Sequence, residues 1–179
     1  MSKALNVAVC QINPTLGNFQ KNIDIISKNY KSAVEKGADL VVFPEMSITG
    51  YPPQDLLNNK EFISQNISCL NELAKSITIP CILGYVDFED NKKFNAAAVC
   101  QDGEIVYKYH KIHLPNYDVF DERRYFHSGD SVGIFDLKVN NSDYKIALQI
   151  CEDLWEDEYE RKISGEIIEN NPDLIINIS

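Results

Sequence analysis

The first half of the chain alternates short apolar runs with apolar residues at helical spacing. Residues 5–12 alternate apolar and polar positions and are rich in Val, which predicts a strand. Residues 19–34 carry apolar side chains at helical spacing and Gly37 follows as a stop, which predicts a helix. Residues 40–43 are entirely apolar and favour a strand buried on both faces. A second helix is predicted over residues 59–77.

The second half of the chain is typical of strands. Five are predicted, at residues 79–88, 94–100, 104–109, 132–139 and 144–150. Gln101-Asp102-Gly103 predicts a tight turn, and residues 140–143 predict a second hairpin connection. A helix at residues 156–170 and a final strand at residues 174–178 complete an α/β pattern. Because domains seldom end on an apolar strand that reads as central, we expect a longer natural protein.

Composition narrows the class of protein. The length of 179 residues suits one domain, and the net charge of −10 argues against nucleic acid as a partner. No run of eighteen apolar residues occurs, so we expect no membrane span, and residues 1–6 lack a signal-peptide pattern. Five cysteines without a C-x-x-C motif argue against a zinc site or a disulfide framework and favour a reducing cytoplasm.

Cys151 ends the last strand of the second hairpin, and two carboxylates, Glu152 and Asp153, follow it directly. A free cysteine is usually a buried core residue. We accept that interpretation for the four cysteines inside strand or helix patterns, Cys10, Cys69, Cys81 and Cys100. A reactive cysteine needs an accessible position and a group that takes its proton. The place of Cys151 at a strand end therefore favours a nucleophile.

Two more charged residues end apolar strands. Glu45 follows residues 40–43 and Pro44, and a carboxylate beside apolar side chains can take a thiol proton and return it to a leaving amine. Lys111 follows the strand at residues 104–109, and a fixed ammonium can stabilise an oxyanion. Either residue alone also fits an ordinary strand end or a solvated side chain. Together with Cys151 they predict an amide-hydrolysing site.

His110 and His113 form an H-x-x-H pattern, which raises the question of a metal. A spacing of three on an extended strand places the two side chains on opposite faces. No carboxylate cluster accompanies them in the sequence, so we expect no metal site. A Cys–His hydrolase with His110, His113 or His127 as its base stays open, because nothing in the sequence selects among the three.

Three segments give the chain a family resemblance. Phe43-Pro44-Glu45, Tyr109-His110-Lys111-Ile112-His113-Leu114-Pro115 and Ile150-Cys151-Glu152-Asp153 occur in the order Glu, Lys, Cys. In this the chain resembles the nitrilase, or carbon–nitrogen hydrolase, superfamily over essentially its whole length. Two loops, residues 49–57 and 114–126, are similar to those of the glutaminase domains of glutamine-dependent NAD synthetases.

The resemblance implies a fold and roles for particular residues. The fold would be a four-layer α-β-β-α sandwich with two mixed sheets, of which residues 1–179 form a part truncated at the C-terminus. Cys151 would attack the glutamine amide, Glu45 would act as base and then acid, and Lys111 with the backbone N–H of Glu152 would hold the oxyanion. The resemblance also implies a supporting role for Glu122 in positioning Lys111, and glutamine binding by Tyr51 and Tyr117.

The resemblance also implies partners. No cofactor is expected in this domain. ATP, magnesium and deamido-NAD would belong to a synthetase domain, which this sequence lacks, and the protein would form homo-oligomers. Two alternatives stay open: a freestanding nitrilase-type amidase acting on a small amide, and a non-catalytic domain of the same fold.

Overall fold

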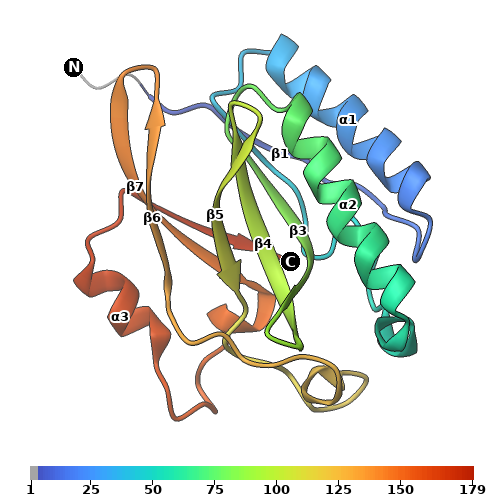
Figure 1. Ribbon diagram of the computed structural model, residues 1–179. Helices are drawn as coiled ribbons and strands as arrows, with labels where there is room; N and C mark the ends of the chain where they lie inside the picture. The colour runs from blue at the N-terminus through green and yellow to red at the C-terminus, as the bar shows by residue number, and fades with distance from the viewer. Residues whose placement is uncertain (1–3) are drawn as a thin grey trace.

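The computed structural model describes residues 4–179 (Figure 1). Residues 1–3, which belong to the N-terminal segment that lacks a signal-peptide pattern, lie outside the described residues. The described helices are α1 (Phe19–Glu35), α2 (Lys60–Ser76) and α3 (Ile163–Glu169). The strands are β1 (Val7–Val9), β2 (Leu40–Val42), β3 (Cys81–Glu89), β4 (Lys92–Gln101), β5 (Glu104–His110), β6 (Gly133–Val139), β7 (Ser142–Ile150) and β8 (Leu174–Ile178).

The strands form two mixed sheets. The first has the order β1-β2-β3-β4-β5, with β1 to β3 parallel and β3 to β5 antiparallel. The second has the order β6-β7-β8, in which β6 and β7 are antiparallel and β7 and β8 are parallel. The expected α/β architecture with two mixed sheets is therefore confirmed.

The layers follow from which faces are apolar. Helices α1 and α2 cover one face of the first sheet, and the second sheet faces its other side, with α3 on the side away from α1 and α2 (Figure 1). One core lies between the helices and the first sheet, with Ile26, Leu70 and Leu83 among its members. Another lies between the sheets and includes Ile82 and Leu148. This is the four-layer α-β-β-α sandwich.

Local signals account for most element ends. Asn18 and Asn59 cap α1 and α2, because the Asn18 side chain accepts a hydrogen bond from the backbone N–H of Lys21 and the Asn59 side chain accepts from those of Glu61 and Phe62. Gly37 follows α1 with a φ of 79°, a conformation that favours glycine. The turn at Asp102-Gly103 joins β4 and β5 with two residues of positive φ, as expected for a tight hairpin. The second hairpin turns at residues 140–141, two residues rather than four.

Three expectations need correction. Of residues 5–12, only Val7–Val9 form a strand, because β1 pairs only with the equally short β2. Residues 156–162 are not helical, and α3 begins only at Ile163, since Tyr159 and Arg161 make tertiary hydrogen bonds instead. Strand β8 lies at an edge of the second sheet, not at its centre, because it pairs only with β7 among the described strands. Within residues 4–179, no helix is long and apolar enough to cross a membrane.

Candidate active site

Glu45, Lys111 and Cys151 each lie just after a strand. Glu45 follows β2, Lys111 follows β5 and Cys151 follows β7, so two come from the first sheet and one from the second. The turn at Glu45 packs directly on Gly84 of β3, where a Cβ atom would lie 2.7 Å from the carbonyl carbon of Glu45. Only glycine allows the strand to approach this closely.

The Lys111 ammonium is completely buried between two carboxylates. Its Nζ lies 2.9 Å from Oε1 of Glu45 and 3.0 Å from Oε1 of Glu122. Burial alone would lower the pKa of Lys111, but the charges of Glu45 and Glu122 raise it above its ordinary value. Lys111 is therefore a permanent cation, fixed in place by ion pairs on two sides.

Glu122 is the second partner of Lys111, and two further side chains hold it. Tyr51 Oη donates to Glu122 Oε1 at 3.2 Å, and Asn95 Nδ2 donates to Glu122 Oε2 at 3.3 Å. Asn95 also donates to Glu45 Oε1. Burial raises the pKa of Glu122, while Lys111 lowers it. One asparagine amide thus connects both carboxylates that flank the ammonium.

Cys151 is half-buried and has a φ of 45°, in the left-handed region. Burial and the charge of Glu45 raise the pKa of its thiol, whereas Lys111 and a hydrogen bond with the Ser179 side chain lower it. The net direction is upward, so the thiol carries its proton at neutral pH. Nucleophilic attack by Cys151 therefore requires a base that takes this proton.

A cleft of about 630 Å³ is lined by Glu152, the residue that directly follows Cys151 in the sequence. Glu152 is buried and accepts hydrogen bonds from Tyr117 Oη at 2.9 Å and from Tyr159 Oη at 3.0 Å. Arg123 also lines the cleft. The cleft thus presents three carboxylates, because Asp157 and Glu158 also line it, together with one guanidinium and two tyrosines.

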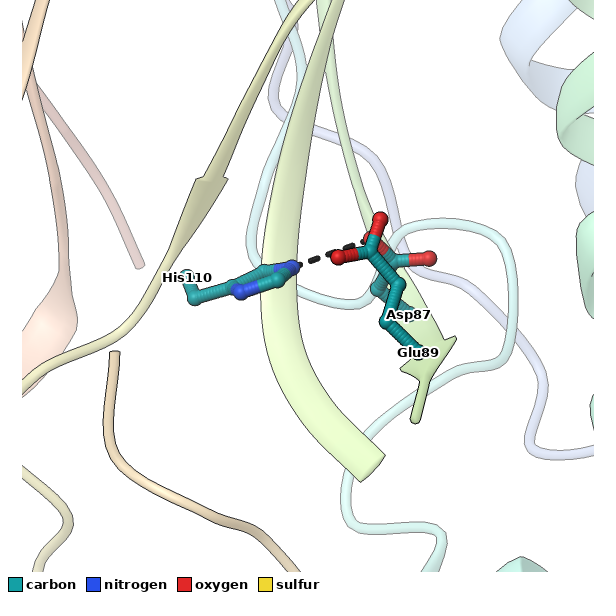
Figure 2. Close-up of side chains that lie close together, drawn as sticks. All are labelled: Asp87, Glu89 and His110. Atoms are coloured by element: carbon teal, nitrogen blue, oxygen red, sulfur yellow. Dashed lines mark hydrogen bonds and ion pairs between the residues drawn. The ribbon is translucent and has the colours of Figure 1, made fainter. Parts of the chain in front are cut away.

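Asp87, Glu89 and His110 form the one group of metal-ligand type found among residues 4–179 (Figure 2). Nε2 of His110 lies 3.0 Å from Asp87 Oδ2. Lys108 Nζ already lies 3.1 Å from Asp87 Oδ2 and 2.9 Å from Glu89 Oε1. Burial would raise the pKa of Asp87, but hydrogen bonds with His110 and Lys108 help to lower it to about 2. The Lys108 ammonium therefore already forms ion pairs with both Asp87 and Glu89.

The two histidines of the H-x-x-H pattern have separate partners. His110 contacts Asp87, whereas His113 Nε2 lies 3.0 Å from the carbonyl oxygen of Arg161 and its ring stacks on Tyr159. A larger cleft, of about 770 Å³, lies between α2 and the end of β3 and is lined by Asp87 and Lys108. It contains none of the residues around Cys151.

The structure brings the residues singled out in the sequence into two hydrogen-bonded groups. Glu45, Lys111, Glu122 and Tyr51 form one hydrogen-bonded group, and Glu152 with Tyr117 forms the other. The charges of Glu45, Lys111 and Glu122 act on the Cys151 thiol, and Cys151 in turn adds to the Glu152 hydrogen bond in raising the pKa of Tyr117 in the second group.

Two residues of these groups were missed in the sequence. Asn95 lies inside a strand pattern and gave no signal. Tyr159 fell in a segment that was interpreted as a helix.

Comparisons with known proteins agree with this arrangement. The family model described as carbon-nitrogen hydrolase matches residues 6–170. A glutamine-dependent NAD(+) synthetase from Thermotoga maritima is 42% identical over 156 residues, covering 86% of this chain and 26% of the relative. One from Synechocystis sp. is 36% identical over 189 residues, covering 97% of this chain and 33% of the relative.

Solved structures show the same fold. The glutamine-dependent NAD+ synthetase from Acinetobacter baumannii superposes with a TM-score of 0.89 and 29% identity, covering 99% of this chain and 32% of that one. An amidase from Nesterenkonia sp. superposes with a TM-score of 0.71 and 23% identity, covering 84% of this chain and 56% of that one. This chain thus spans 26% to 33% of the length of those synthetases. By the match over residues 6–170, it belongs to the carbon–nitrogen hydrolase family.

Proposed function

We propose that this chain is the glutamine-hydrolysing part of a glutamine-dependent NAD synthetase. The observation that carries the proposal is the buried Lys111 ammonium, held between Glu45 and Glu122 with its charge acting on the Cys151 thiol. The relatives from Thermotoga maritima and Synechocystis sp., which bear that name, support the choice of substrate.

In the proposed reaction, Cys151 attacks the side-chain amide carbon of glutamine as Glu45 takes the proton from Sγ. The raised pKa of the thiol makes this proton transfer a necessary part of the step. The amide oxygen gains negative charge in the tetrahedral intermediate. Lys111 Nζ and the backbone N–H of Glu152 stabilise that charge without reorganising, because Lys111 is already fixed by its ion pairs.

Breakdown of the intermediate cleaves the C–N bond. Glu45, now protonated, gives its proton to the departing nitrogen, so that ammonia leaves and a thioester remains on Cys151. Water then attacks the thioester while Glu45 takes a proton from the water. Return of that proton to sulfur releases glutamate and restores the thiol. Glu122 holds Lys111 from its other side throughout.

The cleft beside Glu152 favours an amino acid as substrate over a simple aliphatic amide. A free amino acid carries an ammonium and a carboxylate. The cleft offers the carboxylates of Glu152, Asp157 and Glu158 to the first and the Arg123 guanidinium to the second. Tyr117 lines the same cleft, and Tyr51 donates a hydrogen bond to Glu122. We assign both tyrosines to contacts with bound glutamine.

The remaining partners belong to the longer proteins that this chain resembles. We assign ATP, magnesium and deamido-NAD to a synthetase segment, which would use the released ammonia, and we expect homo-oligomers. Hydrolysis in this chain uses only a thiol, a carboxyl and an ammonium group, and so calls for no cofactor. All five cysteines are free, which supports a reducing cytoplasm as its location.

The test is release of ammonia from glutamine by the chain and by its Cys151→Ala variant. The unmodified chain is expected to release ammonia and glutamate in equal amounts, and Cys151→Ala to release neither. Cys81→Ala is the matched control, because Cys81 is a buried thiol of the first core and should leave the rate unchanged.

Three outcomes contradict the proposal. Equal rates for Cys151→Ala and the unmodified chain exclude Cys151 as the nucleophile. Faster hydrolysis of acetamide or propionamide than of glutamine favours the simple amidase. No modification of Cys151 by a glutamine-like electrophile favours the non-catalytic domain. In a protein that also carries the synthetase segment, Cys151→Ala should abolish glutamine-dependent NAD formation while ammonium still supports it.

A further inference from the structure

Asp153 is a fully buried carboxylate that belongs to neither group around Cys151. It lies two residues after Cys151, in the short 3₁₀ turn Cys151–Leu154 that follows β7. Burial raises the pKa of Asp153, while hydrogen bonds to its oxygens lower it. A carboxylate in this position is costly unless donors satisfy it, so its partners show what it holds.

Four donors converge on the two oxygens of Asp153. Oδ1 accepts from the backbone N–H of Ile112 at 3.0 Å and of His113 at 2.8 Å. Oδ2 accepts from Tyr109 Oη at 2.8 Å and from the backbone N–H of Ile150 at 2.9 Å. Three of these donors flank Lys111 in the sequence, and the fourth directly precedes Cys151.

This side chain therefore ties two segments that come from different sheets. Lys111 follows β5 of the first sheet and Cys151 follows β7 of the second, so backbone pairing within a sheet cannot fix one against the other. Cys151 also has a positive φ of 45°, which is unfavourable for a residue with a side chain. The bond from Ile150 N–H to Asp153 closes the turn around Cys151 and holds it in that conformation.

Only a carboxylate suits this set of partners. Ionised Asp accepts at both oxygens and carries no donor, which matches four incoming donors. An Asn side chain has the same shape but one NH₂ group. Placed toward Oδ2, that group would meet the Ile150 N–H; placed toward Oδ1, it would meet two backbone N–H groups. Either orientation pushes one segment away from the other.

We propose that Asp153 is a positioning residue that sets the place of the Lys111 ammonium relative to the Cys151 sulfur. Its effect on turnover rests on the proposed function, but its effect on the thiol does not. A misplacement of about 1 Å in a reacting group lowers rates by about 100-fold. Asp153→Asn is therefore expected to lower kcat for glutamine by about 100-fold, with KM within about twofold, because Asp153 does not line the cleft.

The second measurement is the rate of alkylation of Cys151 by iodoacetamide as a function of pH, followed by mass spectrometry of the peptide that contains it. Lys111 lowers the pKa of this thiol, so displacement of Lys111 should move the alkylation profile of Asp153→Asn to higher pH. This readout needs no turnover. If the unmodified chain releases no ammonia from any amide, the proposed function fails, and the alkylation profile still decides the role of Asp153.

Two further variants separate positioning from general stability. Leu70→Ala removes a buried side chain of the first core, far along the chain from Cys151, and is expected to lower stability while keeping kcat and the alkylation profile. Tyr109→Phe removes one of the four donors and should change both measurements in the same direction as Asp153→Asn, by less. If Asp153→Asn does not fold, Tyr109→Phe decides.

Unchanged kcat and an unchanged alkylation profile in the folded Asp153 variant, or in Tyr109→Phe if that variant alone folds, would overturn the inference. Equal changes in kcat and in the alkylation profile in Leu70→Ala would also overturn it, provided that the two variants are equally stable.

Discussion

Lys111 shows how a single buried charge can be made permanent. An ammonium removed from water is stable only with good partners, and here Glu45 and Glu122 lie 2.9 and 3.0 Å away. Asn95 shares Oε1 of Glu45 with Lys111 and also binds Oε2 of Glu122, while Tyr51 shares Oε1 of Glu122 with Lys111. The ammonium is thus held by two carboxyl groups from separate segments of the chain.

Lys111→Met is expected to damage both catalysis and folding. Loss of one oxyanion donor lowers kcat by about 100- to 1,000-fold. Two buried carboxylates also lose their cation, and breaking such a pair costs about 3–5 kcal/mol of the free energy of unfolding. Ammonia release and urea denaturation measure the two effects.

The control is Lys108→Met, on strand β5. Its side chain is 39% exposed, so its ion pairs with Asp87 and Glu89 are screened by solvent. The expected loss is at most about 1 kcal/mol of stability, with kcat unchanged. Similar losses of kcat and stability in both variants would mean that the buried ion pairs of Lys111 contribute no more than the exposed ion pairs of Lys108.

At the scale of elements, strand β3 determines where Glu45 lies. A Cβ atom at Gly84 would lie 2.3 Å from the carbonyl oxygen of Pro44 and 2.4 Å from the backbone nitrogen of Met46. Both neighbours are backbone atoms of the turn that carries Glu45, and Ser47 Oγ donates to the Gly84 carbonyl. The turn can pack on the strand only because this residue has no side chain.

Gly84→Ala is therefore expected to shift the Glu45 turn. Overpacking of this kind costs about 1–3 kcal/mol of stability. Displacement of the base by about 1 Å should lower kcat by about 100-fold.

Gly165→Ala, in α3, is the matched control, since its Cβ meets nothing within 4 Å. The free energy of unfolding of Gly165→Ala, measured by urea denaturation, should rise by about 0.5–1 kcal/mol, and its kcat should stay unchanged. A Gly84→Ala variant with normal ammonia release would show that the turn tolerates the displacement.

At the scale of the whole molecule, the first sheet is shared by both cores. Its outer face contributes Leu83 to the core under α1 and α2, and its inner face contributes Ile82 to the core between the sheets. If either core loses its packing, one face of the strands that also line the other core is exposed to solvent. The site depends on this shared sheet, because Glu45 and Lys111 come from one sheet and Cys151 from the other.

Leu148→Ala tests this dependence. Leu148 is fully buried in β7, between the sheets, and its truncation is expected to cost about 2–5 kcal/mol. Because the cores share a sheet, far-ultraviolet and near-ultraviolet circular dichroism should report one coincident transition, shifted as a whole. Two separated transitions would show that the second sheet unfolds independently.

The sequence predicted elements well where the signal was local. Asn59, Gly37 and the Asp102-Gly103 turn each act through their own backbone, and the corresponding elements are confirmed within a few residues. The helix prediction was wrong over residues 156–162, where the Tyr159 side chain binds Glu152 and the Arg161 side chain binds the carbonyl oxygen of Asp130. The pattern of polar and apolar residues along the chain does not indicate such tertiary contacts.

The sequence by itself determined the α/β class and the three strand ends that carry Glu45, Lys111 and Cys151, because hydrophobic spacing and turn residues act locally. Only the tertiary structure decided that Asn95 joins two carboxylates, that Gly84 admits the Glu45 turn, and that Asp153 ties one sheet to the other. These contacts join residues from separate strands, and their geometry exists only once both sheets have packed.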